Sequence, residues 1–305
     1  MYRLGSSNVK NYNLFMEKKP EWIRSKFTAN EKFGRVIKIL KQLNLHTVCV
    51  EAKCPNLGEC WGQGTATFLI LGDICTRHCK FCATKTGNPH GLVDEEEPER
   101  VLKAVEEMNL DYVVITSVTR DDLEDHGAEI YARTVHLIKT KHPDILVEVL
   151  VPDLRENPEH IKKVIESGVD VFAHNVEVVE RLTPEIRDRR ASFKTSLKTL
   201  ELAKKLKPQI YTKSGFMVGL GETKEEIIET MKSLRDIEVN FLTIGQYLRP
   251  SMKHVPVIKY YTHEEFKELE RIGLSMGFDY VASGPLVRSS YRAGEFYLKS
   301  LNSKN

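Results

Sequence analysis

Two groups of cysteines are the residues of this chain whose type and spacing most directly predict chemistry. All six cysteines of the 305-residue chain fall between positions 49 and 82. The groups are C-x4-C-x5-C, made of Cys49, Cys54 and Cys60, and C-x3-C-x2-C, made of Cys75, Cys79 and Cys82. Three thiolates can ligate three irons of a [4Fe–4S] cluster, because soft sulfur ligands suit iron–sulfur sites. Each group therefore predicts one cluster with an iron that no cysteine holds, and a catalytic site needs such an open position.

Disulfides and zinc are the alternatives to iron–sulfur clusters. Three disulfides are disfavoured because the chain lacks a secretory signal and is long enough to bury a core without cross-links. Structural zinc sites usually close at four ligands, often with two C-x2-C pairs, whereas only Cys79 and Cys82 form such a pair here. His46 or His78 would have to complete a zinc site. We therefore favour two clusters, with zinc as the better of the two alternatives.

From residue 65 onward the chain alternates between short β-branched runs and helical patterns. Strands are expected at residues 65–72, 111–118, 145–151, 170–177, 210–220, 240–247 and 280–283. Helices are expected at residues 95–108, 130–138, 158–167, 192–206, 223–234 and 263–276. Nearly continuous apolar strands separated by helices predict a parallel sheet that is covered by helices.

A (β/α) barrel, full or partly open, is the simplest closure of six or seven such repeats, and a doubly wound open sheet is the alternative. In a barrel the chemistry lies at the C-terminal ends of the strands, where the second cysteine group follows the first strand. We expect three parts: an N-terminal extension at residues 1–64 with a helix at 31–43, the barrel at 65–283, and a C-terminal extension at 284–305. Because no Pro/Gly/Ser-rich linker separates them, the extensions should pack on the barrel.

The overall charge and hydropathy disfavour several classes of protein. Lys and Arg number 45 against 43 Asp and Glu, so the net charge of +2 argues against a nucleic-acid partner. No apolar run approaches the roughly 18 residues of a membrane span. The first residues also lack the apolar segment of a secretory signal. We therefore expect a soluble, cytoplasmic protein with no membrane partner.

The second cysteine group, with Phe81 just before its last cysteine, resembles the signature of radical S-adenosylmethionine (SAM) enzymes. Together with the first group and the sequence RSSY at residues 288–291, it resembles one family, the lipoyl synthases. Further stretches that resemble this family are TSVTRDDLEDHGA, FAHNVE, KSGFMVGLGE and GQYLRPS. The resemblance extends from about residue 30 to about residue 300.

This resemblance implies two [4Fe–4S] clusters with different tasks inside a partial, six-stranded barrel of the radical SAM type. In the family, the cluster on the second group binds SAM and cleaves it to a 5′-deoxyadenosyl radical. The cluster on the first group donates sulfur, and its fourth ligand is a serine that corresponds to Ser290. A serine oxygen is a harder ligand for iron than thiolate, which suits a ligand that must be released.

The implied substrate is an octanoyl chain on a lysine of a lipoyl carrier protein, which receives sulfur at C6 and C8. Its C–H bonds are unactivated, so a radical is required and no side chain is assigned as a general acid or base. The implied carrier belongs to the glycine cleavage system or is a lipoyl domain of a 2-oxoacid dehydrogenase. The implied electron donor is a protein such as ferredoxin or flavodoxin, and we expect the chain to be a monomer.

Polar and aromatic side chains near the strand ends are candidates for contacts to SAM. They are Phe81, Thr116, Ser117, Asn175, Glu177 and Arg249. Asn175 and Glu177 lie two residues apart and therefore face the same side of a strand. Each candidate has an ordinary structural alternative, such as a polar barrel lining or a solvated arginine.

Other functions and other surfaces are weaker predictions. A methylthiotransferase is disfavoured because residues 1–64 leave no room for a separate N-terminal domain, and biotin synthase because no cysteine follows Cys82. A metal-binding sensor would not need a complete barrel with an open-site cysteine group at its mouth. The basic run of Lys204, Lys205 and Lys207 is a solvated helix face by default, and its use as a dock for an acidic carrier is a hypothesis.

Overall fold

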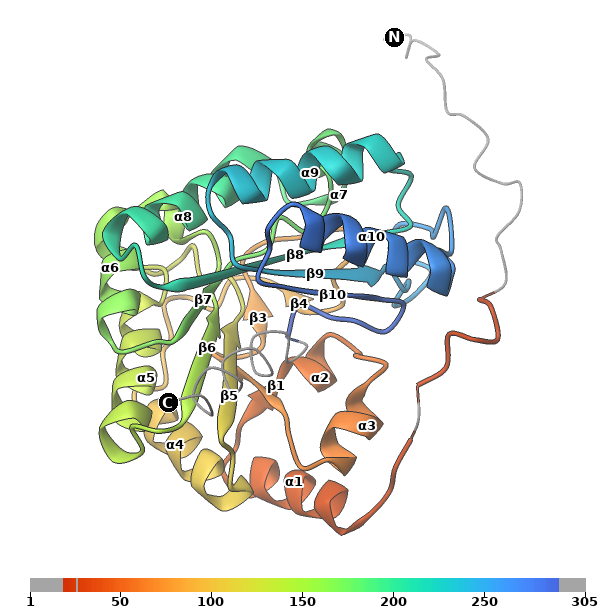
Figure 1. Ribbon diagram of the computed structural model, residues 1–305. Coiled ribbons are helices and arrows are strands. Elements are labelled where there is room, and N and C mark those ends of the chain that lie inside the picture. The colour runs from red at the N-terminus through yellow and green to blue at the C-terminus, as the bar shows by residue number, and fades with distance from the viewer. Residues whose placement is uncertain (1–18, 26, 291–305) are drawn as a thin grey trace, which may run out of the picture.

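Eight strands join into one curved sheet that carries the cysteine-bearing loops at one of its ends (Figure 1). The computed structural model describes residues 19–25 and 27–290. The strands follow the order β1 (His46–Thr47), β2 (Thr67–Ile70), β5 (Tyr112–Ser117), β6 (Leu146–Leu150), β7 (Val171–Ala173), β8 (Tyr211–Val218), β9 (Phe241–Gln246) and β10 (Tyr280–Gly284). All neighbours pair in parallel except β1, which is antiparallel to β2.

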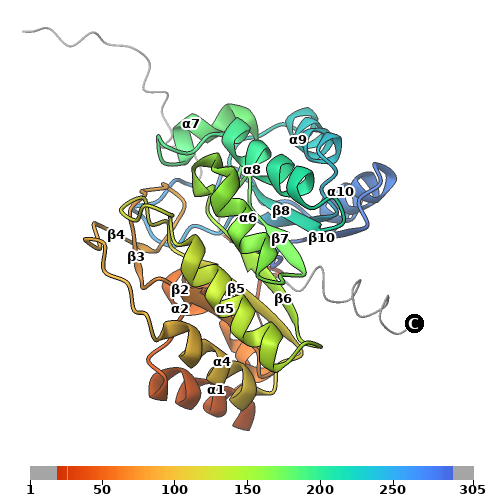
Figure 2. The ribbon, with the colours of Figure 1, turned by 90° about the vertical axis from the view of Figure 1, so that its left-hand side faces the viewer.

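Helices connect the parallel strands and cover the outer side of the sheet. They are α4 (Glu97–Met108), α5 (Ala128–Lys141), α6 (Pro158–Glu166), α8 (Phe193–Leu206), α9 (Lys224–Asp236) and α10 (His263–Ser275). Figure 2 shows α4, α5, α6 and α8 following one another across this surface. Within the described chain the sheet begins at β1 and ends at β10 without closing. The predicted partial barrel is therefore confirmed, and its six βα units are followed by a seventh parallel strand, β10.

The segment before the barrel packs along one edge of the sheet. It contains α1 (Glu31–Gln42), β1, α2 (Val48–Glu51) and α3 (Leu57–Gly62). In β1, His46 is in register with Leu69 of β2, and Thr47 with Phe68. This pairing, which the sequence pattern did not predict, sets the first cysteine group beside the strand that leads to the second group.

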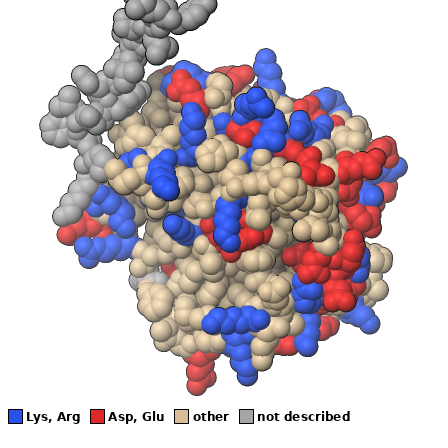
Figure 3. Space-filling view, turned by 180° about the vertical axis from the view of Figure 1, so that it is seen from behind, with Lys and Arg blue, Asp and Glu red and all other residues tan. Residues whose placement is uncertain are grey.

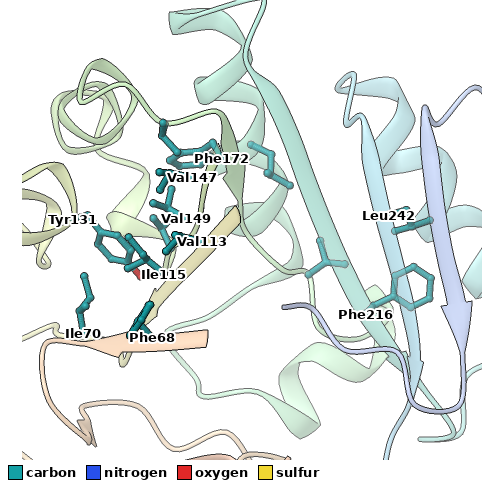
Figure 4. Packing of buried hydrophobic residues seen from close by; sticks show 14 of the residues in the cluster. Phe68, Ile70, Val113, Ile115, Tyr131, Val147, Val149, Phe172, Phe216 and Leu242 are labelled. Atoms are coloured by element: carbon teal, nitrogen blue, oxygen red, sulfur yellow. The ribbon is translucent and has the colours of Figure 1, made fainter. Parts of the chain in front are cut away.

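The two faces of the strands bury different side chains. On the outer face, Val113 and Ile115 of β5 and Val147 and Val149 of β6 pack under the helices, as Figure 4 shows. The alternate residues of β5, such as Tyr112 and Val114, point into the barrel, because successive side chains of a strand face opposite ways. Helices on one face and a filled interior on the other explain why these strands are apolar at nearly every position.

Near the N-terminal ends of the strands, side chains fill the barrel interior. Tyr211 stacks on Phe241 with ring centroids 5.3 Å apart. Above them, Lys213 Nζ donates to Glu148 Oε1 at 2.6 Å, and the Tyr112 hydroxyl donates to Glu148 Oε2 at 2.6 Å. This ion pair is fully buried and hydrogen-bonded, as a charge in a protein interior must be. Any cavity must therefore lie toward the C-terminal ends of the strands.

The turn that follows β6 has an unusual backbone. Leu154, Arg155 and Glu156 all have positive φ, at 44°, 54° and 55°. The left-handed conformation costs a non-glycine residue roughly 1–2 kcal/mol, and such residues normally occur singly. The turn buries Leu154 completely and lets the Asp153 side chain accept the N–H of Arg155 at 3.1 Å. The strain is therefore maintained by burial and by hydrogen bonds to Asp153.

Replacing Glu156 by glycine should stabilise the protein, because glycine adopts positive φ without a Cβ clash. We expect the free energy of unfolding to rise by about 1 kcal/mol for Glu156→Gly, measured by denaturant titration of the purified chain. The matched control is Glu159→Gly in the first turn of α6, where backbone freedom should lower the same quantity by roughly 0.5–1 kcal/mol. Equal destabilisation by both variants would contradict the assignment of strain to this turn.

Candidate metal centre and active-site cavity

A cavity of about 650 Å³ opens at the C-terminal ends of the barrel strands. Its wall includes residues from both cysteine groups and from the end of the described chain: Cys54, Cys75, Cys79, Cys82, Ser289 and Ser290. Several positions of β8 and β9 that line it are small, namely Gly215, Thr243 and Gly245. A Cβ on Gly215 would lie 2.3 Å from Thr243 Oγ1, so a side chain there would crowd the cavity wall. These small residues leave open a space of the kind that aromatic rings fill nearer the N-terminal ends of the strands.

The second cysteine group lies on a loop that is closed at its base. Strand β3 (Ile74–Cys75) pairs in parallel with β4 (Lys85–Thr86), and Gly87 N–H donates to the Cys75 carbonyl at 3.0 Å. Two of the sulfurs accept backbone hydrogen bonds: Cys75 Sγ from Arg77 N–H at 3.4 Å and Cys79 Sγ from Asp188 N–H at 3.3 Å. Amide donors toward sulfur are typical of sites that hold thiolates in an iron–sulfur cluster.

Arg77, which lies between Cys75 and Cys79, fixes this loop to the barrel. Its guanidinium donates to Asp121 at 3.0 and 2.9 Å and to Asp153 Oδ1 at 2.9 Å, with a further bond to Asp153 Oδ2. Asp121 follows β5 and Asp153 follows β6, so one side chain joins the cysteine loop to two strand ends. Burial would raise the pKa of Asp121, but the bonds from Arg77 lower it to about 2. All three groups are buried and charged, and each depends on the others.

The loops after β7 and β9 hold the same cysteine loop from its other sides. Asp188 Oδ2 accepts His78 N–H at 2.9 Å, and the Ile186 carbonyl accepts Lys80 N–H at 2.8 Å. His254 Nε2 donates to the Cys82 carbonyl at 3.0 Å. The backbone of the loop is therefore fixed from four strand ends, while its three sulfurs remain on the cavity wall.

The donor set of the second group fits three corners of an iron–sulfur cluster. All six cysteines of the chain are free thiols. Burial raises the pKa of the Cys79 thiol to about 11 and raises that of Cys82, so both are protonated at neutral pH until a metal displaces the proton. Among the described residues, no fourth cysteine stands beside these three on the loop, so a bound cluster would keep one iron open toward the cavity.

The first cysteine group is distributed over two short helices. Cys49 lies in α2 and is buried, Cys60 lies in α3, and Cys54 lies between the helices on the cavity wall. Burial raises the pKa of the Cys49 thiol. Asn56 Nδ2 donates to the Leu286 carbonyl at 2.6 Å, which ties this segment to the chain end that carries the predicted Ser290 ligand. Cys54 and Ser290 thus lie on the wall of the same cavity, as a shared cluster would require.

The chain end reaches the cavity because Gly245 has no side chain. A Cβ at this position would lie 2.2 Å from the Val287 carbonyl oxygen and 3.4 Å from Arg288 Nη1. The segment before Ser290 therefore crosses directly over β9. Of the RSSY sequence, Arg288, Ser289 and Ser290 are described, and Tyr291 lies outside the described residues.

A polar cluster connects the two cysteine-bearing segments. Ligand atoms of His46, Glu51 and Asp73 all lie within 4.8 Å of one another, with His46 Nδ1 and Glu51 Oε1 3.4 Å apart. Asp73, two residues before Cys75, also pairs with the exposed Lys85 ammonium. The cluster therefore joins the segment of the first group to the base of the loop that carries the second group.

The candidates for SAM contacts all line the cavity but differ in their hydrogen bonds. Asn175 Nδ2 donates to Glu177 Oε1 at 3.1 Å, and Glu177 holds a left-handed backbone with φ of 68°. Burial raises the pKa of Glu177. Strained backbone of this kind is concentrated at ligand sites, so the predicted role of this pair gains support.

The other candidates are partly used by the protein itself. Thr116 Oγ1 donates to the Leu150 carbonyl at 2.9 Å, and Ser117 Oγ donates to the Val118 carbonyl at 2.8 Å. Arg249 donates to the His254 and Met252 carbonyls, which supports its structural alternative as a brace for the loop after β9. Phe81 is half-buried beside the cysteines. Their contacts to SAM stay predictions.

Sequence reasoning missed a chain of polar groups that runs behind the cavity wall. Arg187 Nη1 donates to Ser196 Oγ at 2.8 Å, Ser196 lies 2.9 Å from His174 Nε2, and His174 Nδ1 lies 2.8 Å from the Val151 carbonyl. Arg187 Nε is buried without a partner among the described residues. A buried cation with an unused donor at a cavity is suited to an anionic ligand group. The one sequence signal for this chain of polar groups is the arginine-rich run DRR at residues 188–190, which directly follows Arg187.

Comparison with known proteins places the site in a superfamily. Residues 69–234, which begin in β2 and include the second cysteine group, match the Radical SAM superfamily. The crystal structure of methylornithine synthase has a similar fold, with a TM-score of 0.52 and 14% sequence identity over 77% of this chain and 80% of that chain. A partial barrel with this cysteine loop and this match defines a radical SAM enzyme.

Curated relatives then identify the particular family. Lipoyl synthase of Marinobacter nauticus is 51% identical over 97% of this chain and 84% of its own length. The apicoplast lipoyl synthase of Plasmodium knowlesi is 49% identical over 95% of this chain, which spans 65% of that longer protein. The chain belongs to the lipoyl synthase family, so the family predicted from the cysteine groups is confirmed. In the described part of the chain, no helix has the length and apolar character to cross a membrane.

Removing the Arg77 guanidinium should release the cysteine loop. We expect Arg77→Met to lower the free energy of unfolding by roughly 3–5 kcal/mol, because the Asp153 carboxylate stays buried without a cation. Asp121 would keep only its bonds to the more exposed Arg155 and Arg190. The anaerobically reconstituted variant should also lose about half of its bound iron, from the second group only. Denaturant titration and iron analysis measure these two quantities.

Arg155→Met is the matched control for this variant. Arg155 Nε donates to the same Asp121 at 3.1 Å, but its side chain is 47% exposed. We expect a loss below about 1 kcal/mol and full iron content. Equal effects of the two substitutions would show that Arg77 has no special role.

Protonation of His174 should destabilise the fold at acidic pH. Burial and the charge of Arg187 lower the pKa of His174 to about 4, below its ordinary value of 6.5. The unfolded chain therefore binds a proton that the folded chain rejects, and stability falls as the pH drops below about 6.5. Between pH 7.5 and pH 5 this residue should cost roughly 2 kcal/mol of unfolding free energy. In His174→Gln, denaturant titrations should show a pH dependence smaller by this amount, and an unchanged dependence would contradict the neutral histidine.

Proposed function

We propose that this chain inserts two sulfur atoms, at C6 and C8, into an octanoyl chain that is bound to a lysine of a lipoyl carrier protein. The observation that carries the proposal is that residues of both cysteine groups lie on the wall of one cavity, at the C-terminal ends of the barrel strands. Hydrogen removal and sulfur delivery at the same carbon require these two functions to meet in one space.

The proposed ligand sets follow from the donor atoms. Cys75, Cys79 and Cys82 would hold the cluster that binds SAM, and Cys49, Cys54, Cys60 and Ser290 would hold the auxiliary cluster. When bound, SAM and the first of these clusters supply a radical that removes hydrogen from an unactivated carbon, and the auxiliary cluster supplies the sulfur. A serine ligand supports this assignment, because its oxygen binds iron less tightly than a thiolate does.

The side chains of this protein bind and orient the reactants. Arg187, with its buried unused Nε, is suited to the carboxylate of SAM, while Asn175 and Glu177 offer acceptors and a donor for the amino acid part or the ribose. The small positions Gly215 and Thr243 leave room for an aliphatic chain. Apolar residues on the same wall, such as Leu69, exclude water and so protect a radical from side reactions.

Further parts of the proposal rest mainly on the sequence. We infer a monomeric, cytoplasmic protein that receives electrons from a carrier such as ferredoxin or flavodoxin. The barrel would comprise residues 65–283, the extension before it would carry the auxiliary cysteines, and the extension after it would carry Ser290. The contact of Asn56 with Leu286, which joins the two extensions, supports this division.

Two cysteine variants separate the two halves of the reaction. Anaerobic mixtures would contain reconstituted protein, SAM, a strong reductant and an octanoyl-lysine peptide, and mass spectrometry would follow the products. We expect Cys79→Ala to release no 5′-deoxyadenosine and to leave the peptide unchanged. Cys54→Ala should still release 5′-deoxyadenosine but should add no sulfur.

The wild-type chain is the positive control, with two hydrogens of the peptide replaced by two sulfurs. An unchanged peptide together with abundant 5′-deoxyadenosine from the wild type would overturn the proposed substrate. Sulfur insertion by Cys54→Ala would overturn the assignment of the auxiliary cluster.

A further inference from the structure

Three exposed lysines lie on loops that border the cavity and have no carboxylate partner among the described residues. They are Lys53, Lys80 and Lys253, called the mouth lysines below. Lys53 lines the cavity next to Cys54, and Lys80 lies between Cys79 and the cavity residue Phe81. The mouth lysines thus come from the two cysteine-bearing segments and from the loop after β9.

Backbone contacts bring two of the mouth lysines to the same part of the rim. Val255 N–H donates to the Lys80 carbonyl at 3.2 Å, and the neighbouring His254 donates to the Cys82 carbonyl. Lys253 directly precedes His254, so its loop packs on the loop that carries Lys80. Met252, which is 68% exposed, adds an apolar side chain next to Lys253. This part of the rim is basic and partly apolar.

Several other cations near the mouth already have carboxylate partners. Arg77 is held by two aspartates, Arg190 bonds to Asp188, and Lys85 pairs with Asp73. Figure 2 shows β3 and β4 on the side away from the viewer of Figure 1, and Figure 3 views the molecule from that side. There, basic side chains are scattered over the face, a basic and an acidic group lie together near its middle, and further acidic side chains gather toward the right-hand edge. The free positive charges are therefore available to a partner that approaches the cavity.

We propose that the mouth lysines dock an acidic surface that surrounds the octanoyl-lysine of the carrier protein. This inference rests on the proposed function and identifies the partner surface for it. Because the acyl chain is tethered through one lysine side chain, the carrier surface must lie against the rim while the chain is in the cavity. Carboxylates on that surface complement the unpaired lysines and speed the encounter.

The basic run of Lys204, Lys205 and Lys207 at the end of α8 is less suited to bind the carrier than the hypothesis from the sequence proposed. Lys204 Nζ donates to the Ile210 carbonyl and to Asn240 Oδ1, both at 2.7 Å, and Lys205 pairs with Glu201. Ile210 and Asn240 directly precede β8 and β9, so these lysines lie at the N-terminal ends of the strands. A carrier bound there would hold its lysine at the far end of the barrel from the cavity.

Charge reversal at the rim tests this proposal with two substrates. The probes are an octanoylated carrier of the glycine cleavage system and an octanoyl-lysine peptide without acidic residues. We expect Lys253→Glu, outside the cysteine loop, to raise KM for the carrier by about three-fold at low salt, with kcat nearly unchanged. Values for the peptide should stay within about two-fold of wild type, because the Lys253 side chain is exposed and outside the reacting site. Added salt should narrow the difference between variant and wild type for the carrier.

The variant Lys207→Glu is the matched control, with the same charge change at the other end of the barrel. Equal KM increases for the carrier in both variants would overturn the proposal in favour of a general charge effect. It is also overturned if the rim variant leaves KM for the carrier unchanged, or if it impairs the peptide as much as the carrier. If the wild type converts neither substrate, the proposed function itself fails, which is distinguishable from all three outcomes.

Discussion

The ion pairs of Arg77 with Asp121 and Asp153 are the constraint on which the site depends. They join the cysteine loop to the ends of β5 and β6, with every charge buried. The strained turn after β6 is part of the same arrangement, because Asp153 both accepts the Arg155 N–H and receives Arg77. A flexible loop around three cysteines would lose much entropy on binding a cluster, and this network removes that freedom in advance.

The cavity depends on a second constraint, which is the change of side-chain size along the barrel interior. Aromatic rings and the Glu148–Lys213 pair fill the lower part. Gly215 and Gly245 leave the upper part open, and Gly245 also lets the chain end cross β9 toward the first cysteine group. Two segments that are 230 positions apart in the sequence therefore meet at one wall, where Asn56 binds the Leu286 carbonyl.

The order of strands and helices could be predicted because each element has a strong local pattern, and the predicted bounds lie within a few residues of the observed ones. The cysteine groups were predictable because six thiols crowded into one short segment suit metal ligation better than a disulfide framework. Strand β1 has only two residues, which are too few to show the alternating hydrophobic pattern that predicts a strand. Arg77, Asp153 and Arg187 were missed because long-range partners decide their roles, and a buried arginine looks like a solvated one in a sequence. Glu156 and Glu177 have left-handed backbone conformations. A sequence normally indicates this conformation by a glycine, so it could not be predicted at these two positions.

The central claim is that both cysteine groups serve one cavity, into which the acyl chain is placed. An anaerobic crystal structure of the reconstituted protein with SAM and an octanoyl-lysine peptide tests it most directly. The account predicts a cluster on Cys75, Cys79 and Cys82, a second on Cys49, Cys54, Cys60 and Ser290, and C6 and C8 of the octanoyl chain between them. An acyl chain outside this cavity, or a second cluster separated from it by the barrel wall, would contradict the account.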